Sequence, residues 1–454
     1  MTETLAIAAG DGTDIGVAPP RRRLAGTDLV AHWRSAKSQA KPMKILYITY
    51  DGLTDFIGQS QVLPYLLGSA AAGARFTVVS FEKPDRQAII GAEVERTCRD
   101  AGIDWRPKRF RSSPPYLAKF IDQLAMQRAA SAAIGETRFD LLHCRSYPAA
   151  MAGLAIKRRH GTPLLFDMRG FWPDQRREGG RWSRRSPIGN WLYRRWKGHE
   201  ARLVKQADHI IVLTHAAKRE VESCAAYRGA PISVIPCCAD FDIFEVADRS
   251  AALETRLRLG IGPEDPVLGY LGSIGTVYMI GRHLQLFEAI KRRDPRAKAL
   301  FIGRNQAAEI LSLAADMGVS LDEKDVIVVA GERSELPKWL GAVDVGTCFI
   351  IPRPSSKGVS PTKLAEYLAS GIPVIANTCV GDVEEIVTKL DAGHLLSDFG
   401  AEDVGAAVDA FFKLRTVDRQ ALRRRAQPFD LDVAADAYQA IYRDLHTAVD
   451  VGLR

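Results

Sequence analysis

The chain has 454 residues, more than one hydrophobic core usually organises, so we expect two domains. Hydrophobic residues make up 46% of the chain and charged residues 26%, as in soluble globular proteins, and no apolar run approaches the roughly 20 residues that a membrane-spanning helix needs. The formal net charge is +8, and the N-terminus lacks a signal-peptide core, which favours a cytoplasmic protein.

Cysteine usage limits the metal and redox chemistry to be expected. Seven cysteines form no Cys-x-x-Cys pair and no spacing with histidine that is typical of a metal site. Their odd number favours reduced, buried thiols over disulfides or zinc. We therefore expect no bound metal and no cofactor.

The first half of the chain predicts an α/β domain. Residues 1–43 are small, polar and contain Gly and Pro, which indicates a flexible extension. From Lys44 a buried strand, a helix and a second strand form a βαβ unit, and the pattern repeats to about residue 235, so a doubly wound parallel sheet is expected in a domain of residues 44–245. The expected elements are strand 44–52, helix 61–73, strand 75–82, strand 140–146, helix 149–160, strand 162–170 and strand 209–214.

Basic side chains gather in residues 176–205, where ten of them are interleaved with Trp182, Trp191, Tyr193 and Trp196. This mixture suits an anionic membrane surface, where aromatic rings lie at the headgroup level. The alternative is a solvated basic helix whose Trp side chains pack inward. No nucleic-acid-binding motif accompanies the cluster, so we expect no nucleic acid partner.

The second half predicts another domain of the same class, residues 246–430. A charged helical stretch, residues 247–259, leads into a new series of strands and helices that complete a second parallel sheet. We expect residues 431–454 to form a helix that returns to the N-terminal domain. The other elements expected are strand 266–275, helix 284–291, strand 298–303, helix 307–317, strand 326–331, strand 344–350 and strand 373–377.

Residues 359–377 contain, in this order, a Ser-Pro pair, a helical stretch, a glycine and an apolar strand. Ser360 is a favourable N-cap residue and Pro361 suits the first helical position, so we expect a helix to begin here. Gly371 is expected to end that helix and let the chain turn tightly into the strand that follows.

The start of this helix predicts an anion site. A helix N-terminus presents free N–H groups and a positive dipole end, and Lys363 and Glu366 would flank a phosphate and a polyol at the same opening. The alternative is that Lys363 and Glu366 form an ordinary ion pair on a solvated helix face.

Residues 44–445 resemble the family 4 glycosyltransferases, retaining enzymes of the GT-B fold. The stretches that carry the resemblance are "SVIPCCADFDIF", "VLGYLGSIG", "ALFIGRN", "VVAGERSELPKWLGAVDV" and "SPTKLAEYLASGIPVIANTCVGDVEEIV". Two further stretches, "YDGLTDFIGQSQVLPYL" and "FDMRGFWPDQRREGGRW", are similar to a bacterial subgroup associated with polysaccharide and glycolipid assembly. The resemblance implies two tandem Rossmann-like domains that face one another across a cleft.

The resemblance also implies a nucleotide-sugar site in the second domain. Glu366 matches the Glu that hydrogen-bonds the ribose in this family, and Ser360–Lys363 would receive the diphosphate. The donor-binding residues that we predict are Gly272, Ser273, Arg304, Lys357, Ser360, Thr362, Lys363 and Glu366.

The chain departs from the family pattern at three positions. Gly358 stands where the family has a second Glu, and Ser273 and Met279 stand near the positions of its usual Arg and Lys. No Asp-x-Asp metal signature is apparent. Compensating charge for the diphosphate is therefore expected from Lys357, Lys363 or Arg304.

The acceptor side is predicted from polar residues at strand ends of the first domain. The resemblance places Gly58 and Gln59 in a flexible loop beside donor phosphate and acceptor, and it allows either His143 or Arg145, at the end of a strand, to contact the donor sugar. Arg169 follows a strand and would bind a phosphate-bearing acceptor. We predict catalytic roles for His143 and Arg169, with a structural role as the alternative for His143.

These features together predict a metal-independent retaining hexosyltransferase. It would move a hexosyl unit from a UDP- or GDP-linked sugar to a lipid-linked or growing saccharide, at the inner face of the plasma membrane where the basic segment binds anionic lipid. A GT-B-fold nucleotide-sugar epimerase and a non-catalytic nucleotide-sugar-binding paralogue are the alternatives. A dinucleotide oxidoreductase is disfavoured because no Gly-x-Gly-x-x-Gly follows the first strand.

Overall fold

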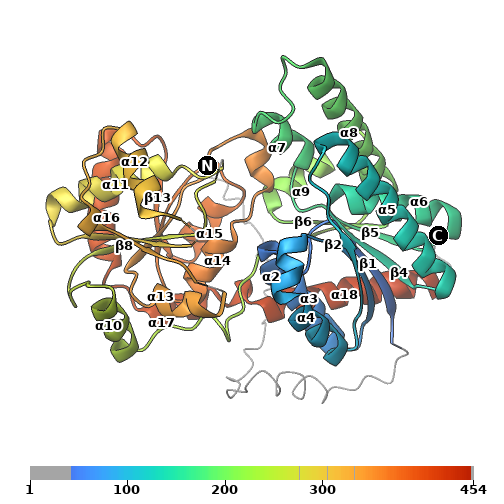
Figure 1. Ribbon diagram of the computed structural model, residues 1–454, viewed down its shortest axis with the longest axis horizontal. Helices are drawn as coiled ribbons and strands as arrows, with labels where there is room; N and C mark the ends of the chain where they lie inside the picture. The colour runs from blue at the N-terminus through green and yellow to red at the C-terminus, as the bar shows by residue number, and fades with distance from the viewer. Residues whose placement is uncertain (1–41, 276, 304, 332, 451–454) are drawn as a thin grey trace, which may run out of the picture.

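The computed structural model describes residues 42–450 except 276, 304 and 332, and shows two α/β lobes (Figure 1). Residues 1–41, which make up almost all of the predicted flexible extension, lie outside the described residues. Arg304, one of the predicted donor-binding residues, also lies outside them.

The first lobe is built on a seven-stranded sheet in the order β3-β2-β1-β4-β5-β6-β7, and every neighbouring pair is parallel. The strands are β1 (Lys44–Thr49), β2 (Arg75–Glu82), β3 (Asp104–Arg109), β4 (Leu141–Arg145), β5 (Leu164–Asp167), β6 (His209–Val212) and β7 (Ile232–Val234). The helices of this lobe are α2 (Phe56–Gln61), α3 (Leu63–Ala71), α4 (Pro84–Asp100), α5 (Pro115–Glu136), α6 (Ser146–His160), α7 (Trp172–Glu178), α8 (Pro187–Gln206) and α9 (His215–Glu222).

Strand residues of the first sheet alternate between two cores. Leu46 and Ile48 pack into one core with residues of α5 and α6, whereas Ile45 and Tyr47 pack into a second core with residues of α3 and α18 (Leu431–Asp450). Successive side chains of a strand point to opposite faces, and helices cover both faces, so these strands read as continuous apolar runs. The same alternation decides below where polar strand residues point.

The second lobe contains a six-stranded parallel sheet in the order β10-β9-β8-β11-β12-β13. The strands are β8 (Val267–Leu271), β9 (Lys298–Ile302), β10 (Val326–Val329), β11 (Val345–Cys348), β12 (Val374–Asn377) and β13 (Gly393–Leu396). The prediction that residues 373–377 complete the sheet was wrong, because β13 pairs with the far side of β12. The helices are α10 (Arg249–Arg258), α11 (Ile280–Arg293), α12 (Ala307–Asp316), α13 (Leu336–Leu340), α14 (Thr362–Ala369), α15 (Val383–Lys389), α16 (Ala401–Leu414) and α17 (Arg419–Arg425), with 3₁₀ turns η1 (Glu323–Asp325), η2 (Arg333–Glu335), η3 (Pro354–Gly358) and η4 (Gln427–Phe429).

The chain passes between the lobes twice, and the two crossings lie side by side. The Ala239 N–H donates to the Phe429 carbonyl at 3.1 Å, and the Leu431 N–H donates to the Ala239 carbonyl at 2.9 Å. Helix α18 then runs along the first lobe (Figure 1), where Tyr438 and Tyr442 are buried in the α3 core. The last helix thus belongs physically to the first lobe.

The basic segment forms α7, a connection and α8, which project from the first lobe (Figure 1). Trp182 and Trp196 pack against Trp172, with ring centroids 5.1 and 4.7 Å away, and the Tyr193 hydroxyl donates to Asp174. These aromatics therefore serve packing, and only part of the predicted surface is available. Among the described residues, no helix is long and apolar enough to cross a membrane.

Candidate active site

The predicted anion-binding helix is present, but its cap differs from the prediction. Helix α14 begins at Thr362 and Pro361 occupies the N-cap position, so the assignment of Ser360 as N-cap was wrong. The Ser360 hydroxyl instead accepts a hydrogen bond from the Cys237 N–H at 3.0 Å, across the two lobes. At the other end Gly371 has φ +67°, the left-handed conformation that ends a helix and that glycine adopts without strain.

Glu366 is buried on α14 and is held by a residue that the sequence did not single out. The Arg333 guanidinium donates to Glu366 Oε1 at 2.9 Å, and Arg333 lies over the ring of Phe244. One of the Glu366 carboxylate oxygens is thereby fixed, while Glu366 Oε2 has no hydrogen-bond or ion-pair partner in the part of the chain that the structure describes. Glu366 is suited to accept from a diol, provided that a ligand enters beside α14.

The turn after β8 lies next to α14 and is fixed by Asn305. The Asn305 amide donates to the Gly272 carbonyl at 2.9 Å and its oxygen accepts from the Ile274 N–H at 2.9 Å. Gly272 has φ +109°, and the neighbouring Ser273 is exposed. The structure thus brings the predicted Gly272–Ser273 turn and α14 together at the carboxyl ends of the strands, where open α/β sheets bind ligands.

Lys363 points from α14 toward this turn. A β-carbon placed on Gly272 would lie 3.6 Å from Lys363 Nζ, and only 5% of Lys363 is exposed. Burial lowers the pKa of Lys363 to about 8, although Cys348 and Glu366 act in the opposite direction. Lys363 is therefore not the solvated surface cation that the sequence left open as the alternative.

Lys357, another predicted phosphate ligand, lies at the contact between the lobes. Its ammonium forms an ion pair with Glu220 of α9 at 2.8 Å, and its carbonyl accepts from the Thr214 hydroxyl. Gly358 packs on the first lobe, since a β-carbon there would lie 3.0 Å from the Phe171 ring. The position where the family has its second Glu has no room for a side chain in this arrangement of the lobes.

Two carboxylates make further contacts between the lobes. Glu178 at the end of α7 accepts from the N–H and the hydroxyl of Ser355 in η3. Asp382, just before α15, accepts from the N–H groups of His215 and Ala216 at 2.6 and 3.1 Å, and so satisfies the N-terminus of α9. These contacts depend on residues far apart in sequence, and no local signal marks them.

Gly58 and Gln59 lie in helix α2, so the prediction of a loop there was wrong. A β-carbon on Gly58 would lie 1.9 Å from the Gly52 carbonyl oxygen, which means that glycine allows α2 to pack on the turn after β1. That turn is held by the buried carboxylate of Glu82, which accepts from the Leu53 and Thr54 N–H groups at 2.9 Å each.

His143 lies in the middle of β4, so the prediction that it ends a strand was wrong. Its ring is 1% exposed, stacks with Tyr438, and has Nδ1 2.7 Å from the Tyr442 hydroxyl. Burial lowers the pKa of His143, so the ring is neutral at pH 7. The α18 aromatics enclose it, and the structure does not bring it to a surface where a sugar would bind.

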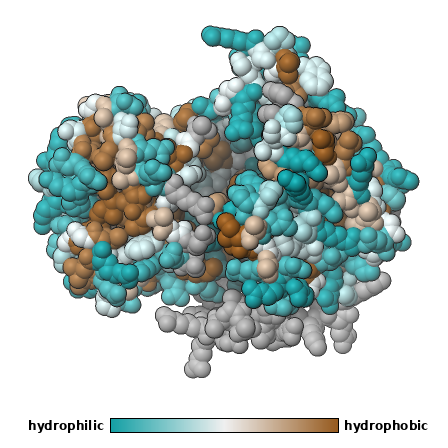
Figure 2. All heavy atoms as spheres, viewed as in Figure 1, coloured by the Kyte–Doolittle hydropathy of each residue, from teal (hydrophilic) through white to brown (hydrophobic). Residues whose placement is uncertain are grey.

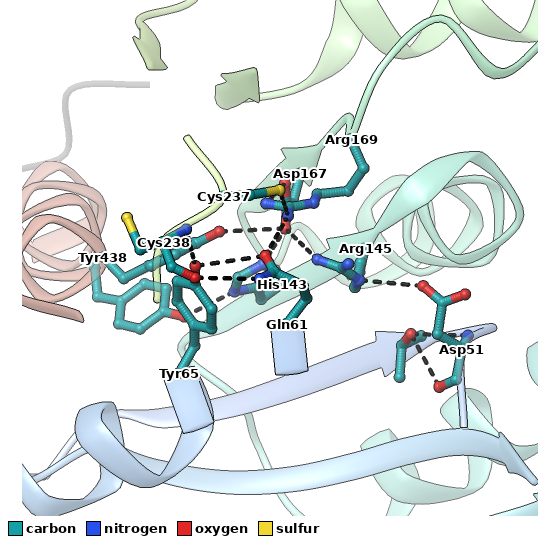
Figure 3. A network of polar contacts seen from close by, with 12 residues as sticks. Asp51, Gln61, Tyr65, His143, Arg145, Asp167, Arg169, Cys237, Cys238 and Tyr438 are labelled. Atoms are coloured by element: carbon teal, nitrogen blue, oxygen red, sulfur yellow. Dashed lines mark hydrogen bonds and ion pairs between the residues drawn. The ribbon is translucent and has the colours of Figure 1, made fainter. Parts of the chain in front are cut away.

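Arg145, Asp167 and Arg169 form a buried charged cluster at the carboxyl ends of β4 and β5 (Figure 3). Both guanidinium groups lie 3.7 Å from the Asp167 carboxylate, and Arg145 also pairs with Asp51 at 3.1 Å. Burial alone would raise the pKa of Asp167, but Arg169, His143 and Arg145 together hold it below its usual value. The cluster is internally neutralised.

Arg169 connects this cluster to the crossing between the lobes. Its guanidinium donates to Gln61 Oε1 at 3.2 Å and to the Cys237 sulfur at 3.4 Å (Figure 3). Its φ of +55° is strained for a side chain of this size. Among the described residues, no group of three or more His, Cys, Asp or Glu side chains is arranged to hold a metal ion.

Two family models match the chain. Residues 66–243 match the model described as Glycosyltransferase Family 4, and residues 265–414 match the model described as Glycosyl transferases group 1. The chain belongs to the family 4 glycosyltransferases. A D-inositol 3-phosphate glycosyltransferase of Mycobacterium marinum is 25% identical over 255 residues, which is 54% of this chain and 52% of that relative, so the match spans about half of the relative's length.

Solved structures share the architecture. HepE of Anabaena in complex with UDP-glucose has a TM-score of 0.64 at 15% identity, covering 88% of this chain and 100% of that one. WaaG, a glycosyltransferase involved in lipopolysaccharide biosynthesis, has a TM-score of 0.63 at 13% identity, covering 88% and 99%. With its two parallel-sheet domains, this family 4 enzyme has the GT-B fold, as the sequence predicted.

Proposed function

We propose that this glycosyltransferase moves a hexosyl unit from a UDP- or GDP-linked sugar to a lipid-linked or growing saccharide, with retention of anomeric configuration, in cell-surface polysaccharide or glycolipid assembly. The observation that carries the proposal is the pairing of Glu366, on α14 beside the Gly272 turn, with Arg333 of η2. This arrangement offers a carboxylate to a ribose diol and a helix N-terminus to a diphosphate. HepE, with bound UDP-glucose, and WaaG support the donor and acceptor classes by analogy of fold.

The mechanism we propose needs no protein nucleophile. The leaving diphosphate develops about two negative charges as the sugar departs, and the α14 dipole with nearby cations stabilises them. The acceptor hydroxyl then attacks the same face of an oxocarbenium-like sugar. Neither a cofactor nor a metal is part of the proposal.

We also propose that the α7–α8 projection docks on anionic membrane. Ile188 and Trp191 are 61% and 58% exposed there. Four exposed cations lie close to them in sequence, namely Arg184, Arg185, Arg194 and Arg195, and Arg195 lies over the Trp191 ring at 5.5 Å. Figure 2 shows hydrophilic and apolar side chains mixed on this projection at the top of the molecule. Exposed apolar side chains with cations nearby suit the headgroup region of anionic lipid, on the cytoplasmic side of the plasma membrane.

A panel of sugar nucleotides tests the proposal. Each UDP- and GDP-hexose is incubated with the protein, with and without a polyprenyl-diphosphate-linked saccharide in detergent, and nucleoside diphosphate release is measured. We expect release from one donor that depends on the acceptor, and an NMR spectrum of the product that shows the donor's anomeric configuration. Interconversion of sugars without acceptor would instead establish an epimerase, and binding without turnover of any donor would establish a non-catalytic paralogue.

A further inference from the structure

Lys363 is a buried ammonium whose surroundings are aromatic. Its Nζ lies 4.0 Å from the ring centroid of Tyr270 and 3.8 Å from that of Tyr278, and it has no hydrogen-bond partner among the described residues. Aromatic faces attract a cation but accept no strong hydrogen bond from it, so all three N–H donors lack a polar acceptor. Burying a polar group without hydrogen-bond partners costs free energy unless a ligand supplies those partners.

The turn after β8 lies next to this ammonium. The Tyr270 hydroxyl donates to the Ser273 carbonyl at 3.0 Å, so the same ring that covers Lys363 also fixes the turn. The left-handed Gly272 has no side chain to fill the space 3.6 Å from Nζ. The two tyrosine rings and the Gly272 turn thus surround one positive charge in the first turn of α14.

Two other cations near α14 already have partners. Lys357 is paired with Glu220 across the lobes, and Arg333 is paired with Glu366. Ser273 and Met279 stand near the positions where the family pattern has basic residues. Lys363 differs from these two cations because, among the described residues, it has no ion-pair or hydrogen-bond partner, and it lies in the first turn of α14, where a diphosphate would bind.

We propose that Lys363 is the diphosphate ligand of this enzyme, an ammonium held in a Tyr270–Tyr278 box that replaces the family's Arg and Lys pair. The inference rests on the proposed function, because it assigns a residue to the donor diphosphate. It deepens that function by predicting that charge compensation comes from inside α14 and not from the β8 turn. The tyrosine rings hold the buried ammonium in place, so little ordering is needed when the diphosphate binds.

Calorimetric titration of UDP, GDP and inorganic pyrophosphate into the full-length protein tests the inference. Lys363→Met keeps the length of the side chain and removes its charge, and Lys389→Met, at an exposed position on α15 of the same lobe, is the control. We expect Lys363→Met to weaken binding of the better nucleotide and of pyrophosphate about ten- to a hundred-fold, as for loss of a charge-assisted hydrogen bond, with Lys389→Met within about threefold of wild type. The corresponding nucleoside should bind both variants as it binds wild type.

Thermal unfolding checks that each variant is folded. If Lys363→Met does not fold, Lys363→Arg and Lys363→Gln replace it. We then expect Lys363→Arg to retain the affinity for nucleotide and pyrophosphate, because it keeps the charge, and Lys363→Gln to lose it. Equal diphosphate affinity in the wild type and in a folded neutral variant would overturn the assignment of Lys363 while leaving the proposed function intact. A wild-type protein that binds neither nucleotide would overturn both.

Discussion

Charged side chains lie at the carboxyl ends of strands in both lobes, but they are compensated differently. In the first lobe, Arg145 and Arg169 share the Asp167 carboxylate and the cluster is closed by protein groups. In the second lobe, Lys363 is as deeply buried but faces aromatic rings and a glycine turn. Burial of neutralised charge fixes architecture, whereas burial of an uncompensated charge calls for a ligand.

The difference assigns separate tasks to the two regions. The first-lobe cluster joins β4 and β5 to α18 and to the crossing at Cys237, because Tyr438 donates to Asp167 and Arg169 donates to Cys237. It therefore holds the lobes and the last helix in place. The α14 region carries the groups that remain able to bind an anion.

The largest expected effect is loss of stability on Asp167→Ala. Removing this carboxylate leaves Arg145 and Arg169 buried without their shared counterion, which should reduce the free energy of unfolding by about 3–5 kcal/mol. Urea denaturation measures this loss. Asp316→Ala, at an exposed position on α12, is the control and should change stability by less than about 0.5 kcal/mol. Equal stability of the two variants would contradict a structural role for the cluster.

Acid should weaken the same cluster in the wild type. The pKa of Asp167 is lower in the folded protein than its ordinary value of 3.8. The stabilisation is therefore fully present above about pH 4 and is lost as pH falls through the lower folded pKa. In Asp167→Ala, the acid-induced loss of stability should be smaller by this amount.

Membrane docking is the next effect in size. Replacing Arg184, Arg185, Arg194 and Arg195 by Gln removes four exposed cations, each worth about 1 kcal/mol near an anionic surface, so sedimentation with phosphatidylglycerol vesicles should fall while nucleotide binding stays intact. Replacing exposed Arg96, Arg159, Arg258 and Lys389 by Gln is the charge-matched control. Wild-type protein that ignores anionic vesicles at low salt would point to a soluble acceptor.

The titration of Lys363 sharpens the contrast between the lobes. Its pKa of about 8 means that the ammonium deprotonates above pH 8, so diphosphate affinity should fall by up to about tenfold per pH unit there. Lys363→Met should show no such slope. Titratable groups around the ammonium do not interfere, since burial raises the pKa of the Cys348 thiol to about 11 and lowers that of His283 to about 3, and burial raises the pKa values of Tyr270 and Tyr278.

The smallest expected effect is that of a chelator. If the α14 dipole and Lys363 stabilise the leaving diphosphate, turnover in EDTA should stay within about twofold of the untreated rate. Activity that disappears in EDTA and returns with Mg²⁺ or Mn²⁺ would show that a metal carries the charge.

Local sequence patterns predicted most of the fold because apolar runs and turn residues are local properties. Strand β1, which begins at Lys44, and strand β8, which ends just before Gly272, were predicted from their runs of apolar residues. Helix α2 was missed because its formation depends on Gly58 packing against Gly52. Strand β13 was missed because most of its residues are only partly buried, so its apolar pattern is weak.

The candidate site could be predicted only in part because its contacts are between distant residues. Lys363 and Glu366 were identified from a helix start, but Arg333 and the Tyr270–Tyr278 box come from other elements. His143 was misplaced because its partner Tyr442 lies 299 residues further along the chain. Residue type and spacing could not show which face of β4 the last helix would cover.

The central claim, that the nucleotide binds beside α14, is tested most directly by two glutamates of the same lobe. Calorimetry compares UDP and GDP affinity for wild type, Glu366→Ala and Glu385→Ala, where Glu385 is exposed on α15. Loss of the Glu366 contact to the ribose should cost about 1.5–3 kcal/mol, roughly a ten- to hundred-fold weaker affinity, and Glu385→Ala should match wild type. Equal affinities of the two variants would remove Glu366 from the site and contradict the account.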